Sequence, residues 1–128
     1  MTMRIALDYD DTYTKDPDAW DGVIDALTMA GHEVMIVTFR DESIPIEKVP
    51  CIPVFSGDEH DSTTWVPLHV FYTGYRAKRN YMRDQGIEID VWIDDSPDTI
   101  VTDSNWTPEE RERWKAQHEE DLSNRVSP

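Results

Sequence analysis

The sequence predicts an α/β fold in which a mostly parallel sheet is covered by helices on both faces. Short apolar runs rich in β-branched residues alternate along the chain with longer stretches whose apolar residues recur at helical spacing. This alternation is typical of parallel strands joined by helices. Because 128 residues are too few for two ordinary cores, we expect a single domain over 1–128.

The first part of the chain predicts a strand, a helix and a second strand. Residues 3–8 form a short apolar run, and 33–38 form another that is rich in β-branched residues. Between them, Asp16 and Pro17 are typical of a helix N-cap and first turn, and Gly31 is a typical stop. The apolar face of this helix has residues three and four positions apart: Trp20, Val23, Ile24 and Leu27.

The stretch 39–64 interrupts the alternation. Pro45, Pro50 and Pro53 argue against a central strand or a long helix there. We therefore expect an irregular loop or a small hairpin inserted into the domain.

The second part of the chain predicts a third strand over 65–73, a basic helix over 74–85 and a fourth buried strand over 91–95. A charged C-terminal helix is expected over 107–124, because Thr107 opens a segment with the spacing of a capping box.

The charge balance limits the partners. The chain has 27 acidic and 12 basic residues and a formal charge of −15, which argues against long nucleic acids and anionic membranes. No apolar run approaches the ~20 residues of a membrane span, and the N-terminus lacks the regions of a signal peptide. Cys51 is the single cysteine, which suits a reducing compartment. We expect a soluble cytoplasmic protein.

Polar side chains follow three of the predicted strands. Asp8 and Asp10 come after the first strand, Thr38 ends the second, and Asp94 and Asp95 end the fourth. The carboxyl ends of parallel strands meet at one edge of a sheet, where ligands bind. Carboxylates this close repel one another unless a cation or a shared task offsets the cost.

These residues belong to a set that resembles the four ordered motifs of the haloacid dehalogenase-like (HAD) phosphohydrolases. The set is LDYDDT over 7–12, a strand ending at Thr38, Lys78 in GYRAKR, and VWIDD over 91–95, and the resemblance covers roughly 3–102. It implies a Rossmann-like three-layer sandwich. The insertion at 39–64 is too short for the cap domain of larger members, so the small capless type is expected.

The resemblance implies a phosphatase that hydrolyses a phosphate monoester. Asp8 would be the nucleophile and form an aspartyl-phosphate, and Asp10 would act as general acid and then as base. Thr38 would bind a phosphate oxygen, and Lys78 would neutralise charge on the phosphoryl group.

The resemblance also implies a bound Mg²⁺. Its ligands would be Asp8, the backbone carbonyl of Asp10, and Asp94, with Asp95 binding directly or through water. A hard cation is what such a group of oxygen ligands selects.

The substrate is expected to be a small phosphorylated metabolite, with nucleotides among the candidates. Residues that would bind it are Thr38, Arg40, Arg76, Lys78 and Arg79. Without a cap domain the site is open, so a large substrate or a second copy in a homo-oligomer would have to cover it.

Three other interpretations stay open. The paired acidic residues could only stabilise turns or cap helices, and Lys78 could lie on a solvated helix face. A receiver-like phosphoacceptor domain also gathers acids, a Thr and a Lys, although here Lys78 precedes the second acidic pair. A catalytically idle HAD-like binding module would keep the same residues without turnover.

Overall fold

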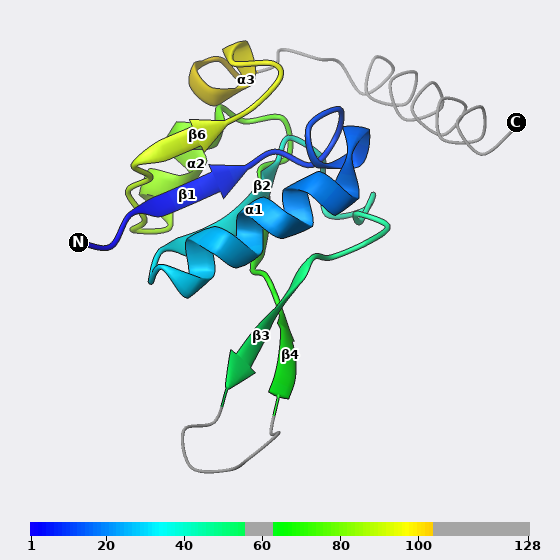
Figure 1. The fold of residues 1–128 in the computed structure, drawn as a ribbon. Helices are drawn as coiled ribbons and strands as arrows, with labels where there is room; N and C mark the ends of the chain where they lie inside the picture. The colour runs from blue at the N-terminus through cyan, green and yellow to red at the C-terminus, as the bar shows by residue number, and fades with distance from the viewer. Residues whose placement is uncertain (56–62, 104–128) are drawn as a thin grey trace, which may run out of the picture.

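The computed structural model describes residues 1–55 and 63–103, which form a parallel sheet with helices on both faces and a separate antiparallel hairpin (Figure 1). The sheet has the order β5-β2-β1-β6, and its three strand pairings are all parallel. Its strands are β1 (Arg4–Leu7), β2 (Glu33–Thr38), β5 (Val70–Tyr72) and β6 (Val91–Ile93). The α/β class with a mostly parallel sheet is therefore confirmed. The predicted helix over 107–124 lies outside the described residues.

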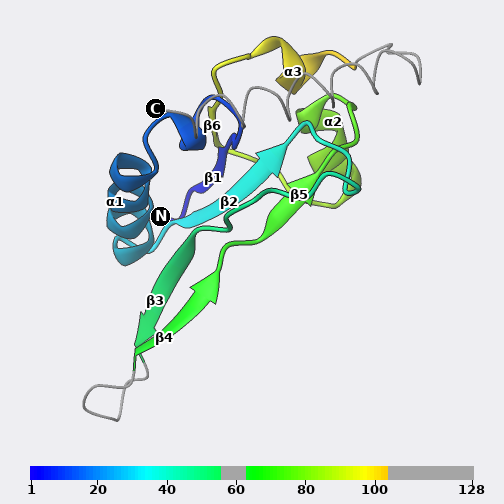
Figure 2. The ribbon, with the colours of Figure 1, turned by 90° about the vertical axis from the view of Figure 1, so that its right-hand side faces the viewer.

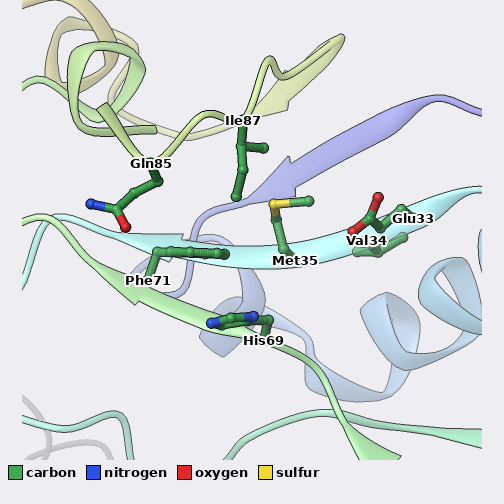
Figure 3. Close-up of a pocket in the computed structure, with 7 residues that line it drawn as sticks. All are labelled: Glu33, Val34, Met35, His69, Phe71, Gln85 and Ile87. Atoms are coloured by element: carbon green, nitrogen blue, oxygen red, sulfur yellow. The ribbon is translucent and has the colours of Figure 1, made fainter. Parts of the chain in front are cut away.

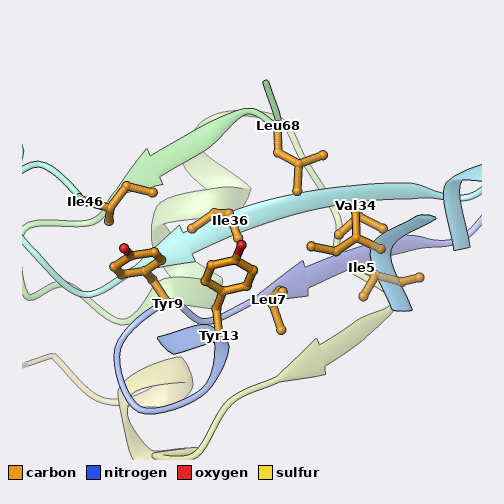
Figure 4. Packing of buried hydrophobic residues seen from close by; sticks show 9 residues of the cluster. Ile5, Leu7, Tyr9, Tyr13, Val34, Ile36, Ile46 and Leu68 are labelled. Atoms are coloured by element: carbon orange, nitrogen blue, oxygen red, sulfur yellow. The ribbon is translucent and has the colours of Figure 1, made fainter. Parts of the chain in front are cut away.

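The two faces of the sheet are buried by different helices. Along β1, Ile5 and Leu7 pack on the side of α1 (Pro17–Met29), whereas Ala6 points to the side of α2 (Lys78–Asp84). Figure 2 shows the two helices on opposite sides of the sheet. The larger cluster, on the α1 side, is drawn in Figure 4. This two-sided burial explains why the strands read as continuous apolar runs.

Helix α1 begins and ends at the residues that the sequence indicates. The Asp16 carboxylate accepts a hydrogen bond from the Ala19 N–H at 3.2 Å. At the other end, the Gly31 and His32 N–H groups bond back to carbonyls of the last turn, as in a Schellman motif. The predicted apolar face is wrong at one position, because Val23 is 40% exposed. The core contacts of the helix come from Trp20, Ile24 and Leu27.

Replacing Gly31 by Ala is expected to lower the free energy of unfolding by about 1 kcal/mol. Gly31 has a φ of +92°, which an L side chain rarely adopts, and an added Cβ would meet nothing within 4 Å, so the cost is conformational. Urea denaturation would measure it. The matched control is Gly22→Ala inside α1, which should stabilise the protein by up to about 1 kcal/mol. Equal effects of the two substitutions would contradict this account.

The insertion contains an antiparallel hairpin of β3 (Cys51–Phe55) and β4 (Thr63–Pro67), which extends away from the sheet (Figure 1). The single strand predicted over 65–73 is therefore wrong. Its first part belongs to the hairpin and only 70–72 joins the sheet as β5. The Leu68 N–H still bonds to the Pro50 carbonyl at 2.8 Å, but Pro50 has no N–H to return the bond, so the hairpin ladder ends there.

The remaining elements are short. Helix α2 starts at Lys78 instead of 74, because Gly74 and Tyr75 have φ values of +62° and +69° that interrupt a helix. A 3₁₀ turn η1 (Tyr13–Lys15) follows β1, and α3 (Asp98–Val101) follows β6. Within the described residues, no helix combines the length and apolar character needed to cross a bilayer.

A pocket of about 290 Å³ lies on the α2 side of the sheet, beside the first residues of β2 (Figure 3). Its lining residues are Glu33, Val34, Met35, His69, Phe71, Gln85 and Ile87. The carboxyl end of β2, where Thr38 stands, is not part of this lining.

Candidate active site

The order of the strands creates a binding position at the carboxyl ends of β1 and β6. The chain runs from β1 outward through β2 to β5, and then returns to the other side of β1 as β6. At their carboxyl ends, β1 leads toward α1 on one face of the sheet and β6 leads to α3, which contacts α2 on the other face, and such a divergence opens a crevice between the two strands. Asp8 directly follows β1, and Asp94 and Asp95 follow β6. The two acidic motifs thus meet at this crevice.

Asp8, Asp94 and Asp95 form the acidic cluster. One carboxylate oxygen from each lies within 4.8 Å of the others. Thr12 joins two of its members, because its hydroxyl lies 3.2 Å from Asp8 Oδ2 and 3.0 Å from Asp95 Oδ1. The same hydroxyl accepts a hydrogen bond from the Asp95 N–H at 3.1 Å. Thr12 therefore fixes the loop after β1 against the loop after β6.

Lys78 is the cation of the cluster. Its Nζ lies 2.8 Å from Asp8 Oδ1 and 2.5 Å from Asp94 Oδ2, and the side chain is 1% exposed. The start of α2 delivers it to this point, and the Asp103 carboxylate holds that start by accepting from the Ala77 N–H at 2.6 Å. Lys78 is therefore a buried partner of the acids and not part of a solvated helix face.

The cluster has more negative charge than Lys78 can balance. Burial, a hydrogen bond with Asp95 and the charge of Asp94 together raise the pKa of Asp8 to about 8, against the lowering effect of Lys78. Three carboxylates beside one ammonium favour uptake of a proton or of a cation. Oxygen ligands at this spacing suit a hard divalent ion, so the cluster could hold a metal.

Asp10 does not join the cluster with its side chain. Its carboxylate is bound by the Arg40 guanidinium, with Nε 2.8 Å from Oδ2 and Nη2 2.7 Å from Oδ1. The Asp10 side chain keeps 17% of its surface exposed, whereas that of Arg40 is fully buried. As a metal ligand, Asp10 would contribute its main-chain carbonyl, which is the role that the family resemblance implies.

The other predicted binding residues lie in two different surroundings. Thr38, at the end of β2, is fully buried and its hydroxyl accepts a hydrogen bond from the Arg40 N–H at 3.3 Å. Since a hydroxyl both accepts and donates, it can still donate to a phosphate oxygen. Arg76 and Arg79 are exposed, and the Arg76 guanidinium pairs with Asp84 at 2.6 Å.

Sequence reasoning did not find the contacts that surround Arg40. Its Nη1 donates to the main-chain carbonyls of Ile44 and Pro45, and Nη2 lies 3.3 Å from the Glu47 carboxylate. Burial lowers the pKa of Arg40, but the hydrogen bond and charge of Asp10, with the charge of Glu47, outweigh it and leave the pKa raised. No spacing or periodicity in 41–47 indicates that this segment contacts Arg40.

The comparisons with protein-family models, curated proteins and solved structures give no match to this chain.

Proposed function

We propose that this protein is a Mg²⁺-dependent phosphatase of the HAD-like, capless type, which hydrolyses a small phosphate monoester. The observation that carries the proposal is the convergence of Asp8, Lys78 and Asp94, from three separate segments, at the carboxyl edge of the sheet. The strand order is further support, because β5-β2-β1-β6 corresponds to the 3-2-1-4 order of Rossmann-like sheets.

The proposed reaction begins at Asp8. One of its carboxylate oxygens forms a bond to phosphorus while the bond from phosphorus to the leaving oxygen breaks, which yields an aspartyl-phosphate. Asp10, in its protonated form with one oxygen still accepting from Arg40, gives its proton to the leaving oxygen and becomes a carboxylate. Lys78 lies against Asp8 and neutralises negative charge on the phosphoryl group, and Thr38 donates to one of its oxygens.

Water completes the cycle in a second step. Asp10 takes a proton from the water that attacks phosphorus, and cleavage of the Asp8–phosphorus bond releases phosphate and restores the carboxylate. Asp8, Asp94 and Asp95 would hold Mg²⁺, together with the carbonyl of Asp10. When bound, the ion supplies positive charge between an anionic nucleophile and an anionic substrate.

The insertion shapes the proposed substrate range. Its described part is a loop and a hairpin that extends away from the sheet, so it gives no cap over the acidic cluster (Figure 2). The charge of −15 disfavours long polyanions, and a phosphorylated metabolite or mononucleotide is the proposed substrate class.

A substrate screen tests this function. Purified protein with Mg²⁺ is incubated with phosphorylated metabolites, nucleotides and phosphate-ended oligonucleotides, and released phosphate is measured. We expect Mg²⁺-dependent release that stops when a chelator is added. A protein that binds Mg²⁺ and accumulates a stable phosphoaspartate from acetyl phosphate, without turnover, would instead support the receiver-like alternative.

The apparent affinity for Mg²⁺ is expected to rise with pH. At pH values below the Asp8 pKa of about 8, the rise should be about tenfold per pH unit. Below that pKa the metal-free protein holds a proton on Asp8, and the ion must displace it. Calorimetric titrations from mildly acidic to mildly alkaline pH would measure the effect. Asp8→Asn, which cannot titrate, should bind more weakly and with a flatter pH dependence. A pH-independent affinity of the unchanged protein would contradict the assignment.

A further inference from the structure

Arg40 has the geometry of an internal brace. All three of its guanidinium nitrogens are engaged: Nε with Asp10, Nη1 with the Ile44 and Pro45 carbonyls at 3.2 and 3.0 Å, and Nη2 with Asp10 and Glu47. Its side chain has no exposed surface. A guanidinium placed in this way faces Asp10 and the segment 44–47, and not the surface where a substrate would lie.

The segment that holds Arg40 is itself attached to the sheet. The Ile46 N–H donates to the Tyr72 hydroxyl at 3.0 Å, and the Lys48 N–H donates to the Tyr9 hydroxyl at 3.1 Å. Tyr9 lies between the two predicted catalytic acids in sequence, and the Arg40 guanidinium stands 5.4 Å from the centre of its ring. The first part of the insertion is therefore tied at one point to β5 and at another to the loop after β1.

We propose that Arg40 is the positioning residue of Asp10, and that segment 44–48 serves to hold Arg40 in place. This inference rests on the proposed phosphatase function. The planar fork of an arginine fixes both oxygens of a carboxylate, which sets the plane and direction of the Asp10 side chain. An acid–base group gains from such fixation because a small displacement from the leaving oxygen is costly in rate. The described part of the insertion thus fixes the orientation of Asp10 through Arg40.

The test is the dependence of rate on the leaving group. A dinitrophenyl leaving group departs without help, whereas an unsubstituted phenyl leaving group needs a proton from a positioned acid. For Arg40→Lys, which keeps the charge but loses the fork, we expect kcat on phenyl phosphate to fall by at least about tenfold and kcat on dinitrophenyl phosphate to change little. Arg40→Met should show the same split with a larger loss. Arg4→Met, at an exposed ion pair with Glu33, is the matched control without a split.

A spectroscopic readout separates this inference from the proposed function. In a nitrogen-edited NMR spectrum, the side-chain signal that disappears in Arg40→Lys is expected to shift in Asp10→Asn and to stay in place in Asp84→Asn, which should move only the signal of Arg76. If the NMR signal of the Arg40 side chain does not shift in Asp10→Asn, the inference is overturned, even if the enzyme is active. An intact pair in a protein that hydrolyses no phosphate ester overturns the proposed function and the positioning role with it. An equal loss on both aryl phosphates reduces Arg40 to a structural role.

Discussion

Asp8→Asn is expected to lower the hydrolysis rate of an aryl phosphate by at least about a thousandfold at saturating Mg²⁺. An amide in place of the carboxylate removes the atom that attacks phosphorus, and the loss should appear in kcat. Released phosphate, measured in steady-state and single-turnover experiments, gives the rate. Retention of the unchanged rate would refute the role of Asp8 as nucleophile.

The same substitution is expected to stabilise the metal-free protein, and the stabilisation should increase with pH. Asp8 in the folded state has a pKa of about 8, above its ordinary value of 3.8, so the fold retains a proton that the unfolded chain has lost. The contribution of Asp8 to stability is therefore complete below about pH 4 and is lost as the pH rises through about 8. Asn cannot ionise, so the gain in melting temperature over the unchanged protein should grow from acidic to alkaline pH. A constant difference would contradict the raised pKa.

Lys78→Met has the largest expected effect on stability, a loss of about 3–5 kcal/mol at mildly alkaline pH in the absence of metal. Met fills a similar volume but leaves the buried Asp94 carboxylate without its ammonium, and Asp8 also loses that partner once it ionises near pH 8. Urea denaturation measures the loss, and activity on an aryl phosphate should fall with it. The destabilisation should shrink as the pH falls below about 8, where Asp8 takes up a proton.

Two controls make the Lys78 result specific. Lys15→Met removes an exposed lysine from η1 and should change stability by less than about 0.5 kcal/mol. Millimolar Mg²⁺ should return part of the lost stability to Lys78→Met, because a ligand that binds only the folded state stabilises it. A Lys78→Met protein as stable as the unchanged one, with or without Mg²⁺, would mean that the ammonium does not balance the acids.

The two central strands could be predicted because they are buried on both faces, whereas the fourth strand, predicted as buried over 91–95, is a half-buried edge strand of 91–93. The strand predicted over 33–38 has those bounds in the structure, and β1 lies within the predicted 3–8. The acidic residues could also be predicted, since polar groups directly after such strands must lie at one edge. Asp8, Asp94, Asp95 and Lys78 lie together because the parallel order of the strands brings their carboxyl ends together.

The rest could not be predicted because it depends on single contacts. The division of 65–73 between the hairpin and the sheet follows from Pro50, which accepts the bond from Leu68 but has no N–H to return it, and no periodicity contains this contact. The pairing of Arg40 with Asp10 could not be predicted either. In the sequence, Arg40 resembles a surface arginine near a phosphate site, and only the tertiary fold places the Asp10 carboxylate 2.7 Å from its Nη2.

The pairing of β1 with β6 has a consequence for the order of events during synthesis. Thr12 and Asp95 are 83 residues apart, and strands separated by this much chain must pay a large loop-closure entropy before they join. A ribosome-bound chain that has emerged only as far as β5 has Asp8, the proposed nucleophile, without Asp94 and Asp95. The ability to bind the ion should therefore arise late in folding, as β6 docks, and nascent fragments that end before it should neither retain metal nor react with phosphate esters.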